Sequence, residues 1–287
     1  MAFSIVILVI GLIVLLIGSY TDIRTREVPD WVDYGLIFIG LGTRLIYSFA
    51  TFDWSYLIEG ILGFAVFLAI AYAMFYAGQW GGGDAKMMMG LGALVGLRFG
   101  WLDFSLSFLF NVFLVGAVYG LVWTSTLAFV NRQEFWAEVK KIVHTPRMLR
   151  IRKMFIISAV IMLVLAMFAG NLALKLLLFA FVAFYLGTFY LWIFIKAVEK
   201  VCMYKLIAPE KLTEGDWIAK DIVVEGKKIC GPKDLGIEMR QIRQLIKLKR
   251  QKKIDKILIK EGIPFVPSFL IAFIATYLFG NMFLMFV

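Results

Sequence analysis

Residues 2–20 read AFSIVILVIGLIVLLIGSY and contain no charged side chain. A helix rises about 1.5 Å per residue, so a run of this length matches the hydrocarbon core of a bilayer, about 30 Å thick. The whole chain has the same character, because 62% of its 287 residues are hydrophobic and 17% are charged. A typical soluble domain has about 45–50% apolar residues. The sequence therefore predicts a polytopic membrane protein and excludes the disordered, coiled-coil and disulfide-scaffold classes.

Long apolar stretches recur along the chain and predict a mainly α membrane helical bundle of about eight spans. We expect the spans at about 2–20, 34–51, 56–79, 85–101, 105–130, 154–170, 173–196 and 264–287. Gly170 and Asn171 form the expected turn inside the long apolar region 154–196. The first stretch has no basic segment before it and no small-residue cleavage site after it. We interpret it as a permanent span and not as a signal peptide.

Five regions follow from this layout. They are a membrane core (1–130), a basic loop (131–153), additional spans (154–196), a soluble insert (197–262) and a final span (263–287). Within the insert, residues 216–224 alternate like a strand, residues 225–227 are a turn, and residues 236–253 have the period of an amphipathic helix. These patterns predict a small α+β unit before the last span.

The basic residues predict the orientation of the chain. If the N-terminus is outside and the spans alternate, most of the Lys and Arg residues face one side, and the insert is on that side. Cytoplasmic loops are enriched in these residues, so we expect a cell-membrane protein with a cytoplasmic insert. The net charge of +10 is then a feature of membrane topology, and no aromatic-basic module indicates nucleic acid. We expect the basic face of the insert helix to meet anionic lipid headgroups.

The rare residues limit the possible chemistry. The single histidine, His144, cannot form a site that needs two histidines, and Cys202 and Cys230 form no C-x-x-C pair. We therefore expect no metal and no cofactor. Any acid–base chemistry is left to the carboxylates, lysines and tyrosines.

Two aspartates lie where predicted spans end on the same membrane face. Asp22 follows the first span, and Asp84 opens the fourth. Two carboxylates at close range do not both ionise easily, so one keeps a proton and the other acts as a base. Each aspartate also has a simpler interpretation: Asp84 as a helix N-cap, and Asp22 as an interfacial charge partnered by Arg24. Their common face favours a catalytic pair.

The neighbouring residues are secondary candidates. Gly81, Gly82 and Gly83 have no side chains, so an extended substrate strand would come close to the main chain beside Asp84. Lys86 steadies the aspartates, holds a substrate carbonyl, or only marks the inside face. The other candidates for substrate contact or site shaping are Arg24, Arg26, Glu27, Pro264 and Pro267, and each also suits an ordinary role in topology, solvation or helix entry.

Two of these segments resemble a known family. Segment 81–86, Gly-Gly-Gly-Asp-Ala-Lys, closely resembles the G-x-G-D-x-K motif of prepilin peptidases. Segment 22–30 resembles the D-x-R-x-R-x-(I/V)-P-(N/D) pattern of their archaeal members, and segment 262–267 resembles the start of their last span. The resemblance implies a membrane aspartic endopeptidase with Asp22 and Asp84 as the catalytic pair, distantly related in mechanism to presenilins. Without a C-x-x-C pair, it implies a peptidase that lacks the N-methylation activity of the bacterial bifunctional enzymes.

The implied substrate is a pilin-like or archaellin precursor, in which a short basic leader precedes an apolar helix. Three alternatives remain open. One is a presenilin-like protease that cuts within a transmembrane helix, and another is a secondary transporter that uses the two aspartates as an ion site. The third is a non-catalytic scaffold for assembling a pilus or archaellum. The absence of a convincing inverted repeat argues against transport, and a scaffold would need neither aspartate.

Overall fold

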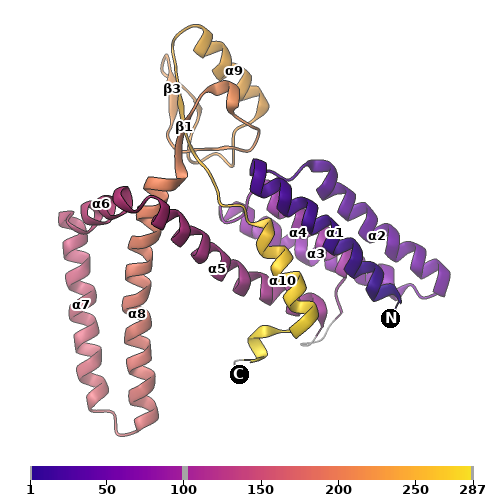
Figure 1. Cartoon of the computed structure of the whole chain (residues 1–287), viewed down its shortest axis with the longest axis horizontal. Coiled ribbons are helices and arrows are strands. Elements are labelled where there is room, and N and C mark those ends of the chain that lie inside the picture. Colours follow the sequence, from indigo (N-terminus) through magenta and orange to yellow (C-terminus); the bar gives the residue numbers. More distant parts are fainter. Residues whose placement is uncertain (1, 99–102, 286–287) are drawn as a thin grey trace. The chain divides into compact units, whose positions relative to one another are not determined.

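The computed structural model describes residues 2–98 and 103–285 of the chain. It consists mainly of helices, with a small strand-containing insert near the C-terminus (Figure 1). This architecture confirms the predicted fold class. The ends of the predicted spans 85–101 and 264–287 fall partly outside the described residues.

The helices follow the apolar stretches, with bounds that differ from the predicted ones by several residues. They are α1 (Ala2–Thr25), α2 (Asp30–Thr51), α3 (Ser55–Tyr76), α4 (Gly82–Val95), α5 (Phe104–Val130), α6 (Arg132–Val143), α7 (Pro146–Met167), α8 (Leu172–Val198), α9 (Met239–Arg250) and α10 (Val266–Phe279). Short π or 3-10 turns are η1 (Glu199–Met203), η2 (Pro209–Lys211) and η3 (Met282–Met285). The strands are β1 (Tyr204–Ile207), β2 (Trp217–Ile218), β3 (Ile222–Val224), β4 (Lys227–Cys230) and β5 (Ile257–Lys260).

The number of spans is not confirmed. Among the described residues, five helices are long and apolar enough to cross a membrane: α1, α2, α3, α5 and α8 together with η1. α10 is a shorter apolar helix, and α4 has only 14 residues. At about 1.5 Å per residue, α4 is about 20 Å long and falls short of the bilayer core.

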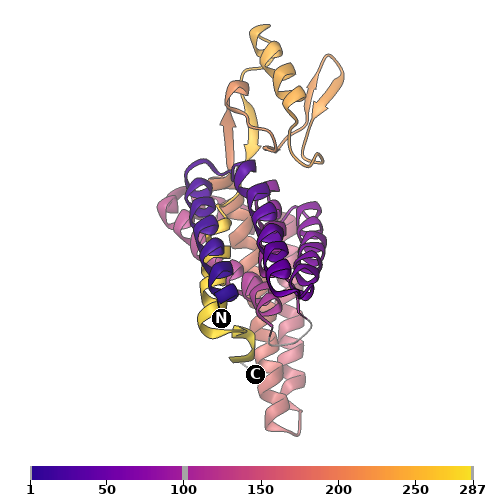
Figure 2. The same cartoon turned by 90° about the vertical axis from the view of Figure 1, so that its right-hand side faces the viewer.

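One compact unit contains the described residues of 1–123, 207–257 and 261–287. Within it, α4 packs against α2 and α3, while α1 packs against α10 (Figure 2). Its core gathers fully buried apolar side chains from these helices and from α5, among them Leu15, Leu36, Phe67, Met87, Leu91, Phe108 and Phe269. α2 and α4 approach so closely that a Cβ at Gly40 would lie 2.7 Å from the nitrogen of Leu94. Small residues permit such contacts between membrane helices.

Arg44 of α2 anchors the C-terminal end of α4. Its side chain is 2% exposed, and its guanidinium donates to the carbonyl oxygens of Leu94 at 3.0 Å, Tyr56 at 2.8 Å and Val95. The last carbonyls of a helix have no partner within the helix, so the bonds to Leu94 and Val95 satisfy groups that would otherwise be buried without one. Glu59 of α3 balances the charge, with an oxygen 3.5 Å from Nη1 of Arg44.

The insert confirms the predicted small α+β unit. β3 and β4 form an antiparallel hairpin, and Glu225 and Gly226 at its turn have φ values of 53° and 77°. The predicted continuous strand 216–224 is wrong, because β2 and β3 are separate and belong to different sheets. β2 is in a sheet with the order β1-β5-β2. Helix α9 buries Ile242 and Leu245, as its amphipathic pattern predicts.

The second unit contains residues 124–206 and 258–260. Here α7 and α8 run side by side in opposite directions, joined at the predicted Gly170–Asn171 turn (Figure 1). The predicted loop over 131–153 contains α6 and the start of α7. Phe135 of α6 is buried in a cluster with Phe189 and Ile193 of α8, and this packing stabilises a helix in spite of its many charges.

Candidate functional site

The last turn of α1 and the first turn of α4 bring Asp22 and Asp84 together. Asp22 is 6% exposed, and its Oδ2 accepts a hydrogen bond from the backbone N–H of Val266 at 2.9 Å. Asp84 accepts one from the backbone N–H of Gly81 at 3.0 Å, which caps the start of α4. Asp22 and Asp84 are 62 residues apart in sequence. Each carboxyl is held by a backbone donor from a different segment.

The two carboxyls interact electrostatically. Burial raises the pKa of Asp84 to about 7, and the charge of Asp22 is the second cause of this rise. Two acids in this relation share protons as a pair, so one of them keeps its proton near neutral pH. Such a pair offers a base and an acid side by side.

The three glycines before Asp84 do not use unusual backbone angles. Gly81 is extended, with φ −71° and ψ 169°, and Gly82 and Gly83 are the first residues of α4. A side chain at Gly82 would meet open space, whereas a Cβ at Gly83 would lie 3.4 Å from the side chain of Val28. The bare main chain at Gly81 and Gly82 is therefore the feature of these glycines that bears on the approach of a substrate, which stays a prediction.

The side chain of Lys86 is paired with residues of α2. Its Nζ lies 2.5 Å from an Asp30 carboxyl oxygen and 5.3 Å from the centre of the Tyr34 ring. Beside it, Asp33 of α2 is fully buried, and neither of its carboxyl oxygens has a hydrogen-bond partner among the described residues. Asp33 interacts electrostatically with Lys86 and Asp84. The sequence analysis missed it because the predicted span begins one residue later.

The three charged candidates at the end of α1 and just after it have different surroundings. Arg24 is exposed, with its guanidinium 5.2 Å from the ring of Tyr20. Arg26 has a φ of 61° and turns its guanidinium over the ring of Trp123 in α5, at 5.3 Å. Glu27 is exposed, and its backbone carbonyl accepts a bond from Thr25. Of the three, Arg26 interacts electrostatically with Asp22.

The two prolines flank the segment that contacts Asp22. Pro264 is buried before α10, and Pro267 is the second residue of that helix. Pro lacks an N–H, so Val266 supplies the donor at the helix start, and this donor is the one that Asp22 accepts. A helix N-terminus carries a partial positive charge, which favours an ionised carboxylate there.

The insert contributes to the surroundings of the site in the same compact unit. Burial raises the pKa of Asp216, and the charges of Glu27 and Glu261 add to this rise. The neighbouring Trp217 lies so close to Gly78, after α3, that a Cβ there would be 3.0 Å from the indole ring. The insert therefore lies near the segment that follows Asp22 and the segment that precedes Asp84.

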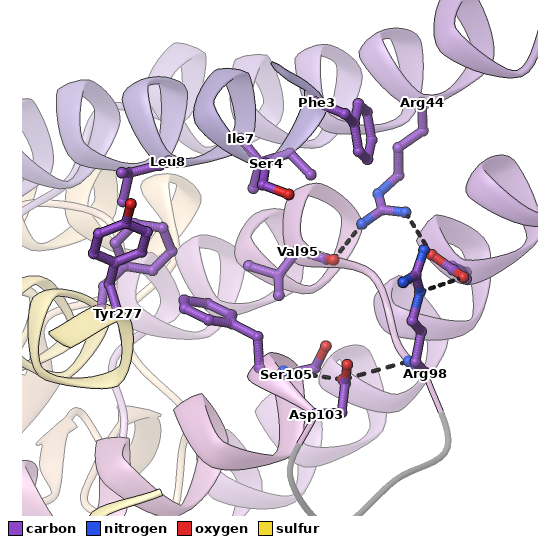
Figure 3. A pocket seen from close by; sticks show the side chains of 13 residues that line it. Phe3, Ser4, Ile7, Leu8, Arg44, Val95, Arg98, Asp103, Ser105 and Tyr277 are labelled. Carbon is purple, nitrogen blue, oxygen red and sulfur yellow. Dashed lines mark hydrogen bonds and ion pairs between the residues drawn. The ribbon is translucent and has the colours of Figure 1, made fainter. Parts of the chain in front are cut away.

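A cavity of about 220 Å³ lies at the other end of α4 (Figure 3). Arg44, Glu59 and Arg98 form its polar wall, and Phe104, Phe273 and Tyr277 contribute apolar surface. Asp84 opens α4, whereas the Arg44 side chain binds its last carbonyls, so the cavity and the aspartates are separate features. The N–H donors of Arg44 are bonded to carbonyl oxygens, and Arg98 forms an ion pair with Glu59. Because these polar groups already have partners, the cavity is a weak candidate for a substrate site.

Among the described residues, no three His, Cys, Asp or Glu side chains gather as a metal ion would need. Tyr119 and Trp123 of α5 are polar neighbours of Asp22 and Arg26 that the sequence analysis missed. Their spacing of four residues was a usable signal, because it puts both on one face of α5.

The comparisons with known proteins point to one family. Residues 9–121 match the model of the type IV leader peptidase family. The preflagellin peptidases of Methanocaldococcus jannaschii and Methanococcus maripaludis are each 41% identical to the chain over 87 residues, which are 30% of this chain and 37% of the relative. That of Methanococcus voltae is 42% identical over 86 residues, 30% of this chain and 36% of the relative. The matches cover little more than a third of these relatives, and they confirm the resemblance seen in the two motifs.

Proposed function

We propose that the chain removes the leader peptide from preflagellin-like or pilin-like precursors, because residues 9–121 match the model of the type IV leader peptidase family. The observation that carries the proposal is the meeting of Asp22 and Asp84 at the ends of two helices within the matched segment. The preflagellin peptidase relatives support the choice of substrate. The chain is on this account an aspartic endopeptidase in the membrane.

The proposed reaction is hydrolysis by the pair of carboxyls. A water molecule between Asp22 and Asp84 attacks the scissile carbonyl carbon, and the ionised carboxylate takes the proton that the water loses. The protonated carboxyl stabilises the oxyanion of the tetrahedral intermediate by donating to it. Collapse of the intermediate breaks the C–N bond, and the leaving nitrogen takes a proton from the pair. The products are a carboxylate on the leader and a free amine on the mature chain.

The surroundings of the two aspartates are alike, so the base and the acid are roles of the pair. Each carboxyl accepts a backbone N–H bond at a helix start, Asp22 from Val266 and Asp84 from Gly81. We treat the one proton of the pair as shared by the two carboxyls in the first step.

The distribution of the basic residues supports cleavage at the cytoplasmic face. The basic residues follow the positive-inside rule only if the Asp22 and Asp84 ends of their helices face the cytoplasm. A basic leader would remain on that side, because translocating several charges across the hydrocarbon core is unfavourable. The junction between the leader and the apolar helix of a precursor then lies at the level of the two aspartates.

Incubation of the purified chain with preflagellin-like and pilin-like precursors tests this function. Mass spectrometry of the products should give a single cut between the basic leader and the apolar helix. A cut inside the apolar helix would favour a presenilin-like activity. Absence of cleavage across a panel of both precursor types, with a folded enzyme, would contradict the proposal.

A further inference from the structure

Three hydrogen-bond donors beside Asp22 are buried without a partner. They are Nη1 of Arg26, the hydroxyl of Tyr119 and Nε1 of Trp123, and none has an acceptor among the described residues. A buried polar group without a partner destabilises a folded protein. Three of them in one place indicate a site that is completed by something outside the chain.

The three donors form one cluster. Tyr119 and Trp123 are four residues apart on α5, with ring centres 5.9 Å apart. The guanidinium of Arg26 lies 5.3 Å from the centre of the Trp123 ring, and the hydroxyl of Tyr119 interacts electrostatically with both Arg26 and Asp22. Arg26 is held there by its backbone, whose N–H donates to the carbonyl of Asp22 at 2.9 Å.

The same face of α5 also contacts the segment that binds Asp22. A Cβ at Gly116 would lie 2.6 Å from the ring of Phe265, and one at Gly120 would lie 3.6 Å from Ile263. These glycines let α5 come close to the residues just before Val266, the donor to Asp22. The cluster therefore borders the catalytic carboxyl on the side of α5.

The chemistry of the cluster selects an acceptor as its ligand. Trp and Arg side chains only donate, and the Tyr hydroxyl donates to any acceptor that approaches. An anion would bring a second negative charge next to the Asp22 carboxylate, which disfavours it. Neutral carbonyl oxygens, such as those of an extended peptide, fit the donors and the charge of the site.

We propose that Arg26, Tyr119 and Trp123 bind main-chain carbonyl oxygens of the precursor next to the scissile bond and so align the extended chain at Asp22. The inference rests on the proposed function and adds its substrate-positioning residues. Asp22 is itself buried, so the movement that admits a substrate to Asp22 also exposes the adjacent donors. Main-chain recognition of this kind tolerates different leader sequences, since every peptide carries the same carbonyls.

The variants Tyr119→Phe and Trp123→Phe test the proposal, with a purified preflagellin precursor as the probe. Each removes one donor, and we expect kcat/KM to fall about tenfold, the effect of losing one net hydrogen bond of about 1.4 kcal/mol. Because the donors have no partner in the empty enzyme, the unfolding midpoint should stay the same or rise. Tyr72→Phe on α3, where Tyr72 is 52% exposed, is the matched control and should leave both quantities unchanged.

A precursor with single backbone changes makes the test specific. Replacing one leader amide at a time with an alkene removes one carbonyl. At one position next to the cut, this replacement should lower cleavage by the wild type, and adding the Tyr119→Phe change to the enzyme should then cause no further loss. Non-interacting sites would give additive losses at every position, which would overturn the proposal. Variants that lose stability together with activity would also overturn it, because the donors would then be structural.

The outcomes separate the two proposals. If the wild-type chain does not cleave the precursor, the proposed function fails and this inference fails with it. If the wild type cleaves and both donor variants cleave equally fast, only the inference about the donor cluster is wrong.

Discussion

Replacing Arg44 with Gln removes a buried charge that binds three backbone carbonyls and faces Glu59. The guanidinium donates to Leu94, Tyr56 and Val95, and the side chain is 2% exposed. The loss of one partner from such a buried network typically costs about 3–5 kcal/mol, because the remaining groups stay buried without partners. At about 2–4 °C per kcal/mol for a chain of this size, the unfolding midpoint should fall by about 6–20 °C.

The neighbouring Arg98 provides a matched control. It binds the same carboxylate, with Nε 2.6 Å from a Glu59 oxygen, but its side chain is 61% exposed. Exposed ion pairs contribute about 0–1 kcal/mol, so Arg98→Gln should lower the midpoint by no more than about 4 °C. Arg44→Lys keeps the charge without the planar fork of donors and should give an intermediate loss.

Thermal unfolding of the purified variants in detergent measures these differences. We expect the unfolding midpoint to fall most for Arg44→Gln, less for Arg44→Lys and least for Arg98→Gln. Equal midpoints for Arg44→Gln and Arg98→Gln would refute the role of Arg44 as the anchor of α4, and with it the view that both ends of this helix are fixed.

Three further predictions concern the site and the insert. The raised pKa of Asp84, about 7, means that its proton is lost as the pH rises through neutrality, so kcat/KM should decline above about pH 7; a pH profile that increases from pH 7 to 9 would contradict this. Asp33→Leu removes a buried carboxyl without partners among the described residues and should stabilise the fold by about 1–3 kcal/mol, seen as a higher unfolding midpoint; a lower midpoint would show that the carboxyl has a partner. The exposed face of α9 that carries Arg243, Lys247 and Arg250 should bind anionic lipid, so hydrogen exchange of α9 should slow in nanodiscs with phosphatidylglycerol relative to phosphatidylcholine. The triple Gln variant should abolish this difference, as should high salt, and equal exchange rates for the wild type in both lipids would disprove lipid contact.

The basic face of the insert helix is less available to lipid than its sequence implies. Lys249 binds Glu210 at 2.7 Å, and Lys253 binds Glu225. The hydrophobic period predicts which side of α9 is buried, but it cannot predict partners that come from η2 and from the β3–β4 turn. The lipid test above therefore uses Arg243, Lys247 and Arg250.

Hydropathy predicted the helical core well and its ends less well. The predicted first span stops at residue 20, whereas α1 continues through Asp22 to Thr25, because a helix persists through polar residues once its apolar part is fixed. The predicted loop 131–153 is helical for a different reason. Its many charged residues lower the mean hydropathy of the segment, although one face carries the apolar residues Phe135 and Ile142. Tertiary packing of this face stabilises the helix.

Asp22 and Asp84 could be proposed from the sequence because each lies in a local motif at the end of an apolar run. The spacing of Tyr119 and Trp123 puts both on one face of α5, but the sequence does not state that this face meets Asp22 and Arg26, nor which groups surround Asp33. Asp33 has a sequence signal in hindsight, a carboxyl at the start of an apolar helix, but nothing in the sequence states that it lacks a partner. Contacts between helices distant in the chain decide these cases.

Cleavage of a preflagellin precursor by Asp22→Asn and Asp84→Asn variants tests the central claim most directly. Asn keeps the shape of each side chain but cannot take up or release the required proton. We expect both variants to fold and to lose cleavage entirely, while Asp53→Asn, an exposed aspartate in the turn before α3, cleaves at the wild-type rate. Near wild-type cleavage by either site variant would contradict the two-aspartate mechanism.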